Sequence, residues 1–350
     1  MLYQTKSPHG GDIYGGRVLL DFSANTNPLG TPQSVLDAVC RELGNIHRYP
    51  DPYCRALVQA ISAHEGVPEK NILCGNGAAE LIYSYCFAVR PQRALEFAPT
   101  FSEYSLAAQR VGCSVQHFPL LEENEFVPDE SLLSCLIDNQ PDVLFLCNPN
   151  NPTGRLVPPP LMESILSVCA KDGIRVFLDE CFLDLTEEGL SLTGRLGEYP
   201  ELFILKAFTK SYGMAGIRLG YGMSADKKLL AKMSETVPPW NVSSLAQTAG
   251  IAALQEKEFL EKTRALIRAE RDWLQRELTA LGFQAVPSSA NYILFKAAPW
   301  LEIKLQRKAI LIRDCSNYNG LGPGWYRIAV RRCDENEQLI AAIREIIKDS

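Results

Sequence analysis

Residues 142–154 read DVLFLCNPNNPTG, an apolar run of strand length followed directly by a turn rich in asparagine and proline. A run that is apolar at nearly every position is typical of a strand covered by helices on both faces. Similar runs lie at residues 93–97, 175–179 and 202–207, with helical patterns between them. This alternation predicts an α/β fold with a largely parallel sheet.

The chain is expected to form two lobes, because 350 residues exceed the usual size of one domain. The alternating pattern covers residues 33–237, which we interpret as a large domain. After Pro238-Pro239 come a long helical stretch with a break near residues 255–257, several short strands and a final helix. Residues 238–350 are therefore predicted as a smaller α+β domain, and residues 1–32 as an N-terminal arm with a segment of that small domain.

The composition narrows the class of protein. Hydrophobic residues make up 46% and charged residues 22%, as in ordinary globular proteins. A net charge of −6, with no basic cluster beyond Arg331-Arg332, argues against nucleic-acid binding. No apolar run reaches the ~20 residues of a membrane span, and the first residues lack the apolar region of a secretory signal. The 11 cysteines and 4 histidines show no metal-ligand spacing, so we expect a cytoplasmic protein without a metal site.

Four predicted strands run directly into polar or glycine-rich sequence. These ends are Gly75-Asn76-Gly77, residues 148–154, Asp179-Glu180 and residues 208–211. Because ligands of open α/β sheets bind beyond the carboxyl ends of the strands, the four ends are expected to meet at one site. Each end alone also fits a plain turn, a helix cap or a solvated lysine.

In order along the chain, NPNNPTG, then DECF about 30 residues later, then TK and GIRLGY resemble the aspartate aminotransferase superfamily. These are fold-type I pyridoxal-phosphate enzymes, and the resemblance covers nearly the whole chain. It implies a large domain with a mostly parallel sheet, a smaller α+β domain and pyridoxal 5'-phosphate as cofactor. It also implies a homodimer with shared active sites.

Within this superfamily the sequence resembles most the threonine-phosphate decarboxylases of cobalamin biosynthesis, which are relatives of the histidinol-phosphate aminotransferases. One feature is His9-Gly10-Gly11 ahead of DFSANTNPLG. Another is Phe182, where the related aminotransferases usually have a tyrosine. The third is the tail ILIRDCSNY followed by WYRIAVR.

The resemblance implies a role for individual residues around the cofactor. Lys210 would carry the cofactor as a Schiff base, Asp179 would pair with its pyridine nitrogen, and Asn151 would donate to its phenolic oxygen. An aromatic side chain would cover the ring, by spacing Phe101 or otherwise Tyr104. The phosphate would be held by Gly77, Ala78, Ala79, Thr209 and Arg218, with Tyr49 reaching the phosphate of the neighbouring subunit.

Physical chemistry asks for the same residue types. A lysine that forms a Schiff base must lose its proton, which nearby cations promote. A carboxylate keeps the pyridine nitrogen protonated, so that the ring accepts electrons. Backbone N–H groups at a helix start bind phosphate. Ala78, Ala79 and Ala207 stand where the family often has polar side chains, so the phosphate must depend on backbone amides, Thr209 and Arg218.

By the same resemblance, the substrate contacts are His9, Gly10, Asn25, Asn151, Arg313 and Arg327. Two arginines on neighbouring strands can bind two anionic groups, which suits a small phosphorylated amino acid. The implied reaction converts O-phospho-L-threonine to (R)-1-aminopropan-2-yl phosphate and CO₂. Anchoring a distal phosphate can turn the carboxylate out of the plane of the conjugated system, and the bond so oriented is the one that breaks.

Three alternatives stay open at this point. The first is a transaminase acting on histidinol phosphate or another phosphorylated amine. The second is an O-phosphoserine decarboxylase, whose substrate differs by one methyl group, worth only ~1–3 kcal/mol in a pocket. The third is a regulator or scaffold that keeps the fold without catalysis, although the set of Lys210, Asp179, Asn151 and Arg218 argues against it.

Overall fold

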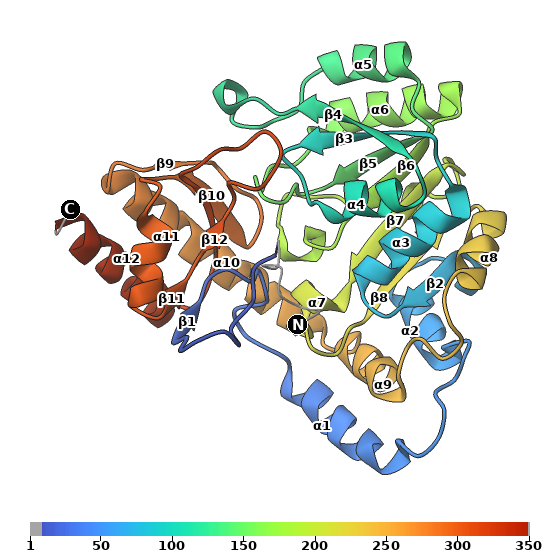
Figure 1. Ribbon diagram of the computed structural model, residues 1–350. Helices are drawn as coiled ribbons and strands as arrows, with labels where there is room; N and C mark the ends of the chain where they lie inside the picture. Colours follow the sequence, from blue (N-terminus) through green and yellow to red (C-terminus); the bar gives the residue numbers. More distant parts are fainter. Residues whose placement is uncertain (1–8, 349–350) are drawn as a thin grey trace.

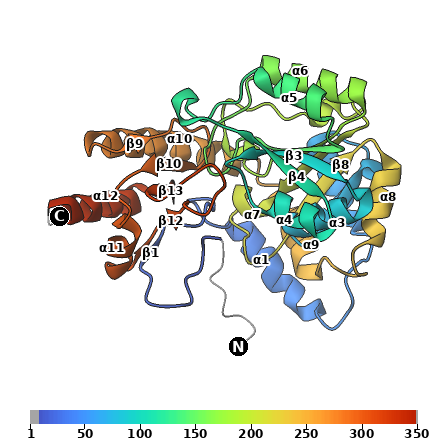
Figure 2. The ribbon, with the colours of Figure 1, turned by 45° about the horizontal axis from the view of Figure 1, so that its top comes forward.

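The computed structural model describes residues 9–348, which form a large lobe and a small lobe side by side (Figures 1 and 2). The large lobe is built around a seven-stranded sheet and the small lobe around a four-stranded sheet. A short pair of strands joins the N-terminal segment to the small lobe.

The seven-stranded sheet has the order β2-β8-β7-β6-β5-β3-β4. β3 to β7 pair in parallel, and β8 is antiparallel to both of its neighbours. The prediction of a largely parallel α/β sheet is confirmed. Its strands are β2 (Ile72–Gly75), β3 (Arg93–Ala98), β4 (Ser114–Pro119), β5 (Val143–Cys147), β6 (Arg175–Asp179), β7 (Leu202–Ala207) and β8 (Gly220–Ser224).

Helices cover both faces of this sheet, which explains why its central strands are apolar throughout. Leu144 and Leu146 of β5 belong to one hydrophobic cluster, with α5 and α6, while Val143, Phe145 and Cys147 belong to the other, with α3, α4 and α8. Neither face of β5 meets water, so alternation is absent from its sequence. These helices are α3 (Ala78–Val89), α4 (Glu103–Arg110), α5 (Ser131–Asn139), α6 (Pro159–Asp172) and α8 (Lys227–Glu235).

Three further helices pack together at the β2 side of the large lobe (Figure 1). They are α1 (Gln33–Glu42), α2 (Arg55–Glu65) and α9 (Ser244–Ala253). The Ser243 hydroxyl caps α9 by accepting a hydrogen bond from the Ala246 N–H at 3.1 Å. α9 ends at Ala253 and α10 starts at Lys257, which confirms the predicted break in the long helical stretch.

The small lobe has an antiparallel sheet of order β12-β13-β10-β9 covered by helices. The N-terminal strand β1 pairs in parallel with β11 beside it. The strands are β1 (Leu20–Asp21), β9 (Gln284–Ala285), β10 (Tyr292–Lys296), β11 (Ile310–Leu311), β12 (Arg313–Asp314) and β13 (Trp325–Ala329). The helices are α10 (Lys257–Ala280), α11 (Leu301–Arg307) and α12 (Cys333–Lys348).

The quoted stretch GIRLGY, residues 216–221, belongs only in part to a strand, because β8 starts at Gly220. Arg218 has a φ of 60°, outside strand geometry, because the chain turns there before it enters the sheet. Among residues 9–348, no helix is long and apolar enough to cross a membrane.

Phe177 tests how much the α3 side of the sheet contributes to stability. Its ring is fully buried, with centroids 4.8 Å from Tyr85 and 5.1 Å from Phe203. We expect Phe177→Ala to lower the free energy of unfolding by about 3–5 kcal/mol in urea titrations, because a cavity replaces the ring. The control is Phe87→Ala on α3, 42% exposed, with an expected loss below about 1 kcal/mol. Equal losses in the two variants would contradict this account of the core.

Candidate active site

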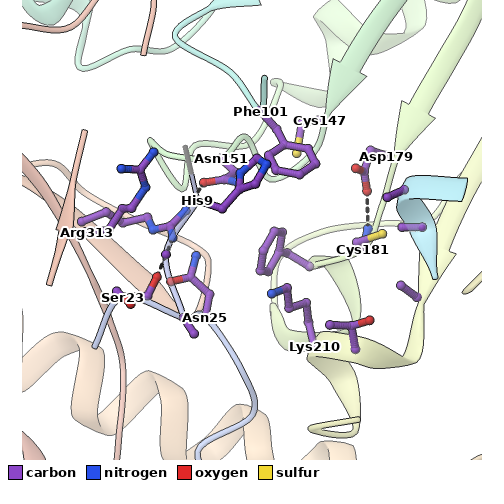
Figure 3. A pocket seen from close by; sticks show the side chains of 18 of the residues that line it. His9, Ser23, Asn25, Phe101, Cys147, Asn151, Asp179, Cys181, Lys210 and Arg313 are labelled. Atoms are coloured by element: carbon purple, nitrogen blue, oxygen red, sulfur yellow. Dashed lines mark hydrogen bonds between the residues drawn. The ribbon is translucent and has the colours of Figure 1, made fainter. Parts of the chain in front are cut away.

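A cavity lies beyond the carboxyl ends of β5, β6 and β7, where they face β12, β13 and the N-terminal segment (Figure 3). It brings together all but two of the side chains singled out from the sequence. These are His9, Gly10, Asn25, Ala78, Ala79, Phe101, Tyr104, Asn151, Asp179, Thr209, Lys210, Arg218, Arg313 and Arg327.

The two exceptions are Gly77 and Tyr49. Gly77 lies directly behind the lining: its φ is 81°, and a Cβ there would come within 2.7 Å of Arg218 Nη2. Tyr49 lies away from this cavity, is 79% exposed and stacks on Trp240 with ring centroids 4.6 Å apart. Its predicted contact with a neighbouring subunit stays a prediction.

Lys210 lies on a single helical turn, α7 (Phe208–Ser211), which follows β7 directly. Its Nζ is 5.7 Å from the centroid of the Phe182 ring. Burial lowers the pKa of Lys210 to about 8, and the charges of Arg327 and Arg218 act in the same direction. A lysine with this pKa is partly neutral near pH 7, as a nucleophilic amine must be.

Asp179 is the last residue of β6 and is buried. Its Oδ2 accepts a hydrogen bond from the Tyr104 hydroxyl at 2.6 Å, and its Oδ1 accepts one from the Cys181 N–H at 2.9 Å. Burial raises the pKa of Asp179, and these hydrogen bonds oppose that effect. The carboxylate is thereby fixed in direction at the bottom of the cavity.

The structure separates the two aromatic candidates. The ring of Tyr104 is fully buried and stacks on Phe145, with centroids 5.6 Å apart, while its hydroxyl is committed to Asp179. Phe101 lies beside His9 at the edge of the cavity (Figure 3). This placement favours Phe101 as the aromatic that covers a bound ring, and gives Tyr104 the task of holding Asp179.

The start of α3 provides a site for a phosphate group. None of the described residues caps this helix with its side chain, and its first residues Ala78 and Ala79 line the cavity. Glu80, in the first turn, does not line the cavity; its Oε2 accepts a hydrogen bond from the Asn76 N–H at 2.7 Å. Unpaired N–H groups at a helix start, next to the guanidinium of Arg218, are suited to a dianion.

Arg313 and Arg327 line the cavity from the small lobe, on the side opposite Lys210. They lie directly opposite each other on β12 and β13, so their side chains leave the sheet on one face. Arg327 is buried; Nη1 donates to Asn151 Oδ1, and Nη2 donates to the Ser23 carbonyl at 3.0 Å. Arg313 donates from Nη2 to Asn317 Oδ1 at 2.8 Å. Two guanidinium groups so placed can bind two anionic groups of one ligand.

The donor set fits pyridoxal phosphate. A neutralisable amine at Lys210, a fixed carboxylate at Asp179 and an uncapped helix start beside Arg218 match its aldehyde, its pyridine nitrogen and its phosphate. Two buried polar atoms at the cavity, Asn25 Oδ1 and Arg327 Nε, have no hydrogen-bond partner among the described residues. Buried groups of this kind are normally satisfied, so a polar ligand is expected there.

Several lining residues were not assigned to the site from the sequence: Ser23, Ala24, Cys147, Cys181 and Tyr318. Ser23 contributes its backbone carbonyl to Arg327, and a carbonyl leaves no signature in residue identity. A weak signal existed for it, since Ser23 lies inside the quoted stretch DFSANTNPLG.

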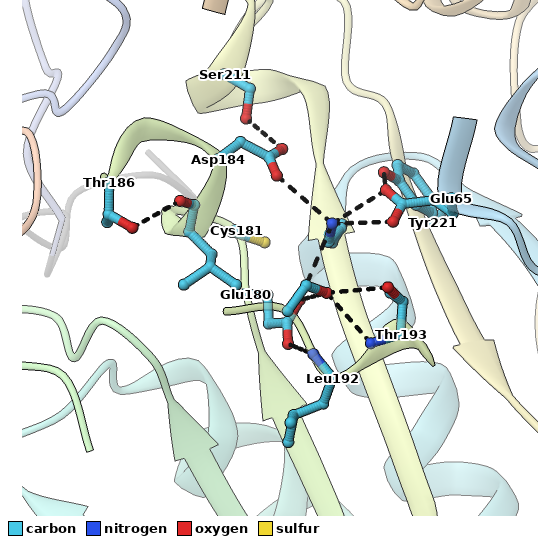
Figure 4. A network of polar contacts seen from close by, with 12 residues as sticks. Glu65, Glu180, Cys181, Asp184, Thr186, Leu192, Thr193, Ser211 and Tyr221 are labelled. Carbon is cyan, nitrogen blue, oxygen red and sulfur yellow. Dashed lines mark hydrogen bonds and ion pairs between the residues drawn. The ribbon is translucent and has the colours of Figure 1, made fainter. Parts of the chain in front are cut away.

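A buried ionic network lies beside the turn that carries Lys210 (Figure 4). Lys206 Nζ is 3.0 Å from Glu65 Oε1 and 3.5 Å from Asp184 Oδ1. Asp184 Oδ2 in turn accepts a hydrogen bond from the Ser211 hydroxyl at 3.0 Å. On the other side, Asn27 Nδ2 donates to the Ser211 carbonyl at 2.7 Å. The residue after Lys210 is therefore held from two directions.

Comparisons with known proteins agree with this geometry. The family model for aminotransferase class I and II matches residues 17–343. The chain is similar to the threonine-phosphate decarboxylase of Salmonella typhimurium, with 38% identity over 97% of each chain. The histidinol-phosphate aminotransferase structure from Clostridium acetobutylicum has a TM-score of 0.89 at 30% identity, covering 95% of this chain and 100% of that one. The L-threonine-O-3-phosphate decarboxylase structure from Porphyromonas gingivalis has a TM-score of 0.83 at 25% identity, covering 94% and 100%.

Lys206→Met tests the buried ionic network. Lys206 and Glu65 are 6% and 5% exposed, so removing the cation leaves buried carboxylates without it. We expect a loss of about 3–5 kcal/mol in the free energy of unfolding, measured in urea. Lys262→Met is the control, because Lys262 pairs with Glu258 at the surface and contributes about 0–1 kcal/mol. A loss as small as that of the control would contradict the proposed role.

The pKa of Lys210 sets the pH dependence of cofactor capture. With the pKa lowered from 10.5 to about 8, the neutral amine fraction rises about tenfold per pH unit below pH 8 and levels off above it. We expect the rate at which cofactor-free protein captures pyridoxal phosphate to follow this curve, measured by absorbance. Borohydride reduction and peptide mapping should place the adduct on Lys210, and Lys210→Arg should prevent it. A midpoint near pH 10 would disprove the shift.

Proposed function

We propose that this chain, which belongs to the class I and II aminotransferase family, decarboxylates O-phospho-L-threonine to (R)-1-aminopropan-2-yl phosphate and CO₂ for the cobalamin nucleotide loop. The family is pyridoxal-phosphate dependent, and the relatives named threonine-phosphate decarboxylase support this lyase activity. The observation that carries the substrate class is the opposed pair Arg313 and Arg327, facing Lys210 across one cavity.

When bound, pyridoxal phosphate supplies a ring that accepts the electron pair left on Cα as CO₂ departs. The residues around it provide charge and position. Asp179, fixed by Tyr104 and the Cys181 N–H, presents a carboxylate of constant direction. Arg218 and the start of α3 hold a phosphate group, and Phe101 covers one side of the cavity. These assignments rest on the matching chemistry of ligand and side chains.

The two opposed arginines differ in burial, and this difference supports bond selection. Arg327 is buried and fixed by Asn151 and Ser23, so it offers an anion site of constant direction. Arg313 is less buried and packs over the Tyr318 ring at 5.3 Å, so it offers a second site nearer the opening. A substrate held at both anionic ends has one orientation about Cα, and that orientation selects which bond breaks.

Lys210 is suited to return a proton. Its amine lies in the same cavity as Asn151 and Arg327, and with a pKa of about 8 the free amine would carry and give up a proton near neutral pH. Phe182 is adjacent and has no hydroxyl, so it cannot compete as a proton donor there. Lys210 therefore serves both as the attachment point and as the acid.

We propose a cytoplasmic homodimer as the working form. Several apolar side chains on the α1 side of the large lobe are exposed, among them Ile46 at 63%, Tyr49 at 79% and Trp240 at 44%. Burial in a second copy would remove this surface from water. In that dimer Tyr49 would reach the phosphate of the neighbouring cofactor, as in the family.

The decisive experiment follows CO₂ release from O-phospho-L-threonine by the cofactor-loaded protein. We expect turnover that Lys210→Ala lowers by at least about a thousandfold, and a KM that Arg327→Met raises by about 10² because a buried charge pair is lost. Arg332→Met, an exposed arginine outside the cavity, is the matched control.

Parallel assays separate the alternatives. O-phospho-L-serine, which lacks the methyl group of phosphothreonine, tests whether the site requires that group. Histidinol phosphate with 2-oxoglutarate tests for transamination. Turnover confined to the histidinol phosphate assay would disprove the lyase proposal. CO₂ released faster from phosphoserine would move the assignment to that substrate.

A further inference from the structure

We propose that Glu103 is a positioning residue for the substrate: it anchors His9, and with it the N-terminal arm of residues 9–17, at the cavity. His9 Nε2 lies 2.7 Å from Glu103 Oε1. His9 lines the cavity, whereas Glu103 does not. Glu103 therefore acts on a ligand through His9, and the inference rests on the proposed function for the identity of that ligand.

Glu103 is itself firmly placed. It is the first residue of α4, where the helix dipole favours a negative charge, and its side chain is 13% exposed. The Tyr83 hydroxyl of α3 lies near it, and the bond to His9 is the main cause that lowers the pKa of Glu103. An ionised carboxylate on a rigid helix start is a suitable anchor for a histidine ring.

The arm needs an anchor because its own contacts are few and polar. Gly11 N–H donates to the Ser23 hydroxyl at 2.8 Å, and Gly10 fits so closely that a Cβ would lie 2.3 Å from the Ser23 carbonyl oxygen. Beyond Gly11, residues 12–17 are exposed, with Tyr14 at 91%. These contacts place the arm beside Ser23, whose carbonyl also binds Arg327.

The contacts of His9 connect the arm to the large lobe. Its ring lies against Phe101, with centroids 5.7 Å apart, while Nε2 is committed to Glu103 (Figure 3). The imidazole thus lies over the aromatic side chain that borders the cavity. Without Glu103, the ring would lose this hydrogen bond, and the arm would spend less time in the position that completes the cavity wall.

The expected signature is an effect on substrate affinity without an equal effect on chemistry. Glu103→Ala should raise the KM for O-phospho-L-threonine about tenfold, the size of one charge-assisted hydrogen bond, with kcat changed less than about threefold. Glu103→Gln, which keeps the size of the side chain, should give a smaller rise. Glu123→Ala removes an exposed carboxylate elsewhere and should change neither constant.

A double-mutant cycle separates positioning from a general effect on α4. If Glu103 acts through His9, the KM of the double variant with His9→Ala and Glu103→Ala should equal that of His9→Ala alone. A further tenfold rise in the double variant would overturn the proposal. Thermal unfolding of each variant checks that α4 stays folded.

A second readout needs no substrate. Arg17 is exposed in the arm, so trypsin cleavage after it reports how often the arm leaves the protein. In the cofactor-loaded protein, Glu103→Ala and His9→Ala should speed this cleavage by about fivefold or more, as predicted for the loss of an anchoring bond of this strength. Glu123→Ala should leave it unchanged. Cleavage of Glu103→Ala at the control rate would overturn the anchoring role, whatever the substrate of the protein is. The absence of CO₂ release from O-phospho-L-threonine by the wild type would instead refute the proposed function.

Discussion

The position of Lys210 depends on a helix of four residues, and a helix that short cannot hold itself in place. Its stability comes from the residues around it. Asp184 holds the Ser211 hydroxyl, Asn27 holds the Ser211 carbonyl, and Lys206 keeps Asp184 in place from the core of the sheet. These contacts hold the amine of Lys210, which is partly neutral near pH 7, just beyond the end of β7.

The charged side chains around Lys210 determine which ligands the cavity favours. Among residues 9–348, the cavity lining contains the basic side chains Lys210, Arg218, Arg313 and Arg327 but a single carboxylate, Asp179. Like charges in a confined volume repel one another, so the cavity favours anionic ligands and a neutral Lys210. A cofactor phosphate and a doubly anionic substrate offset this repulsion, and each at the same time fixes a direction in space. The same charges therefore account for both the binding and the orientation of these ligands.

The two sides of the cavity are built differently. On the large-lobe side, Asp179 and the start of α3 are fixed by strand ends and hydrogen bonds that do not involve a ligand. On the other side, a pair of short strands and a polar arm bring Arg313 and His9 into place. The first side suits a resident cofactor. The second suits a ligand that enters and leaves at each turnover, because His9 and Arg313 are more exposed than Asp179.

The sequence predicted the sheet and most of the cavity, because a residue at the end of a buried strand has only one edge of the sheet to occupy. Asp179, Asn151 and Lys210 are brought together for that reason. Hydrogen bonds between distant residues could not be predicted in this way. Tyr104 and Asp179 are 75 positions apart, and His9 and Glu103 are 94 apart; nothing in their local sequence indicates the pairing.

Residue type and order therefore predicted the fold, through the periodicity of the strands, whereas the cofactor and the substrate class were implied by the resemblance to a known family. Only the tertiary structure showed that the Tyr104 hydroxyl donates to Asp179, that Arg313 and Arg327 lie opposite each other, and that His9 bonds to Glu103. Such pairings depend on the approach of side chains from separate elements, which packing fixes and local sequence does not encode.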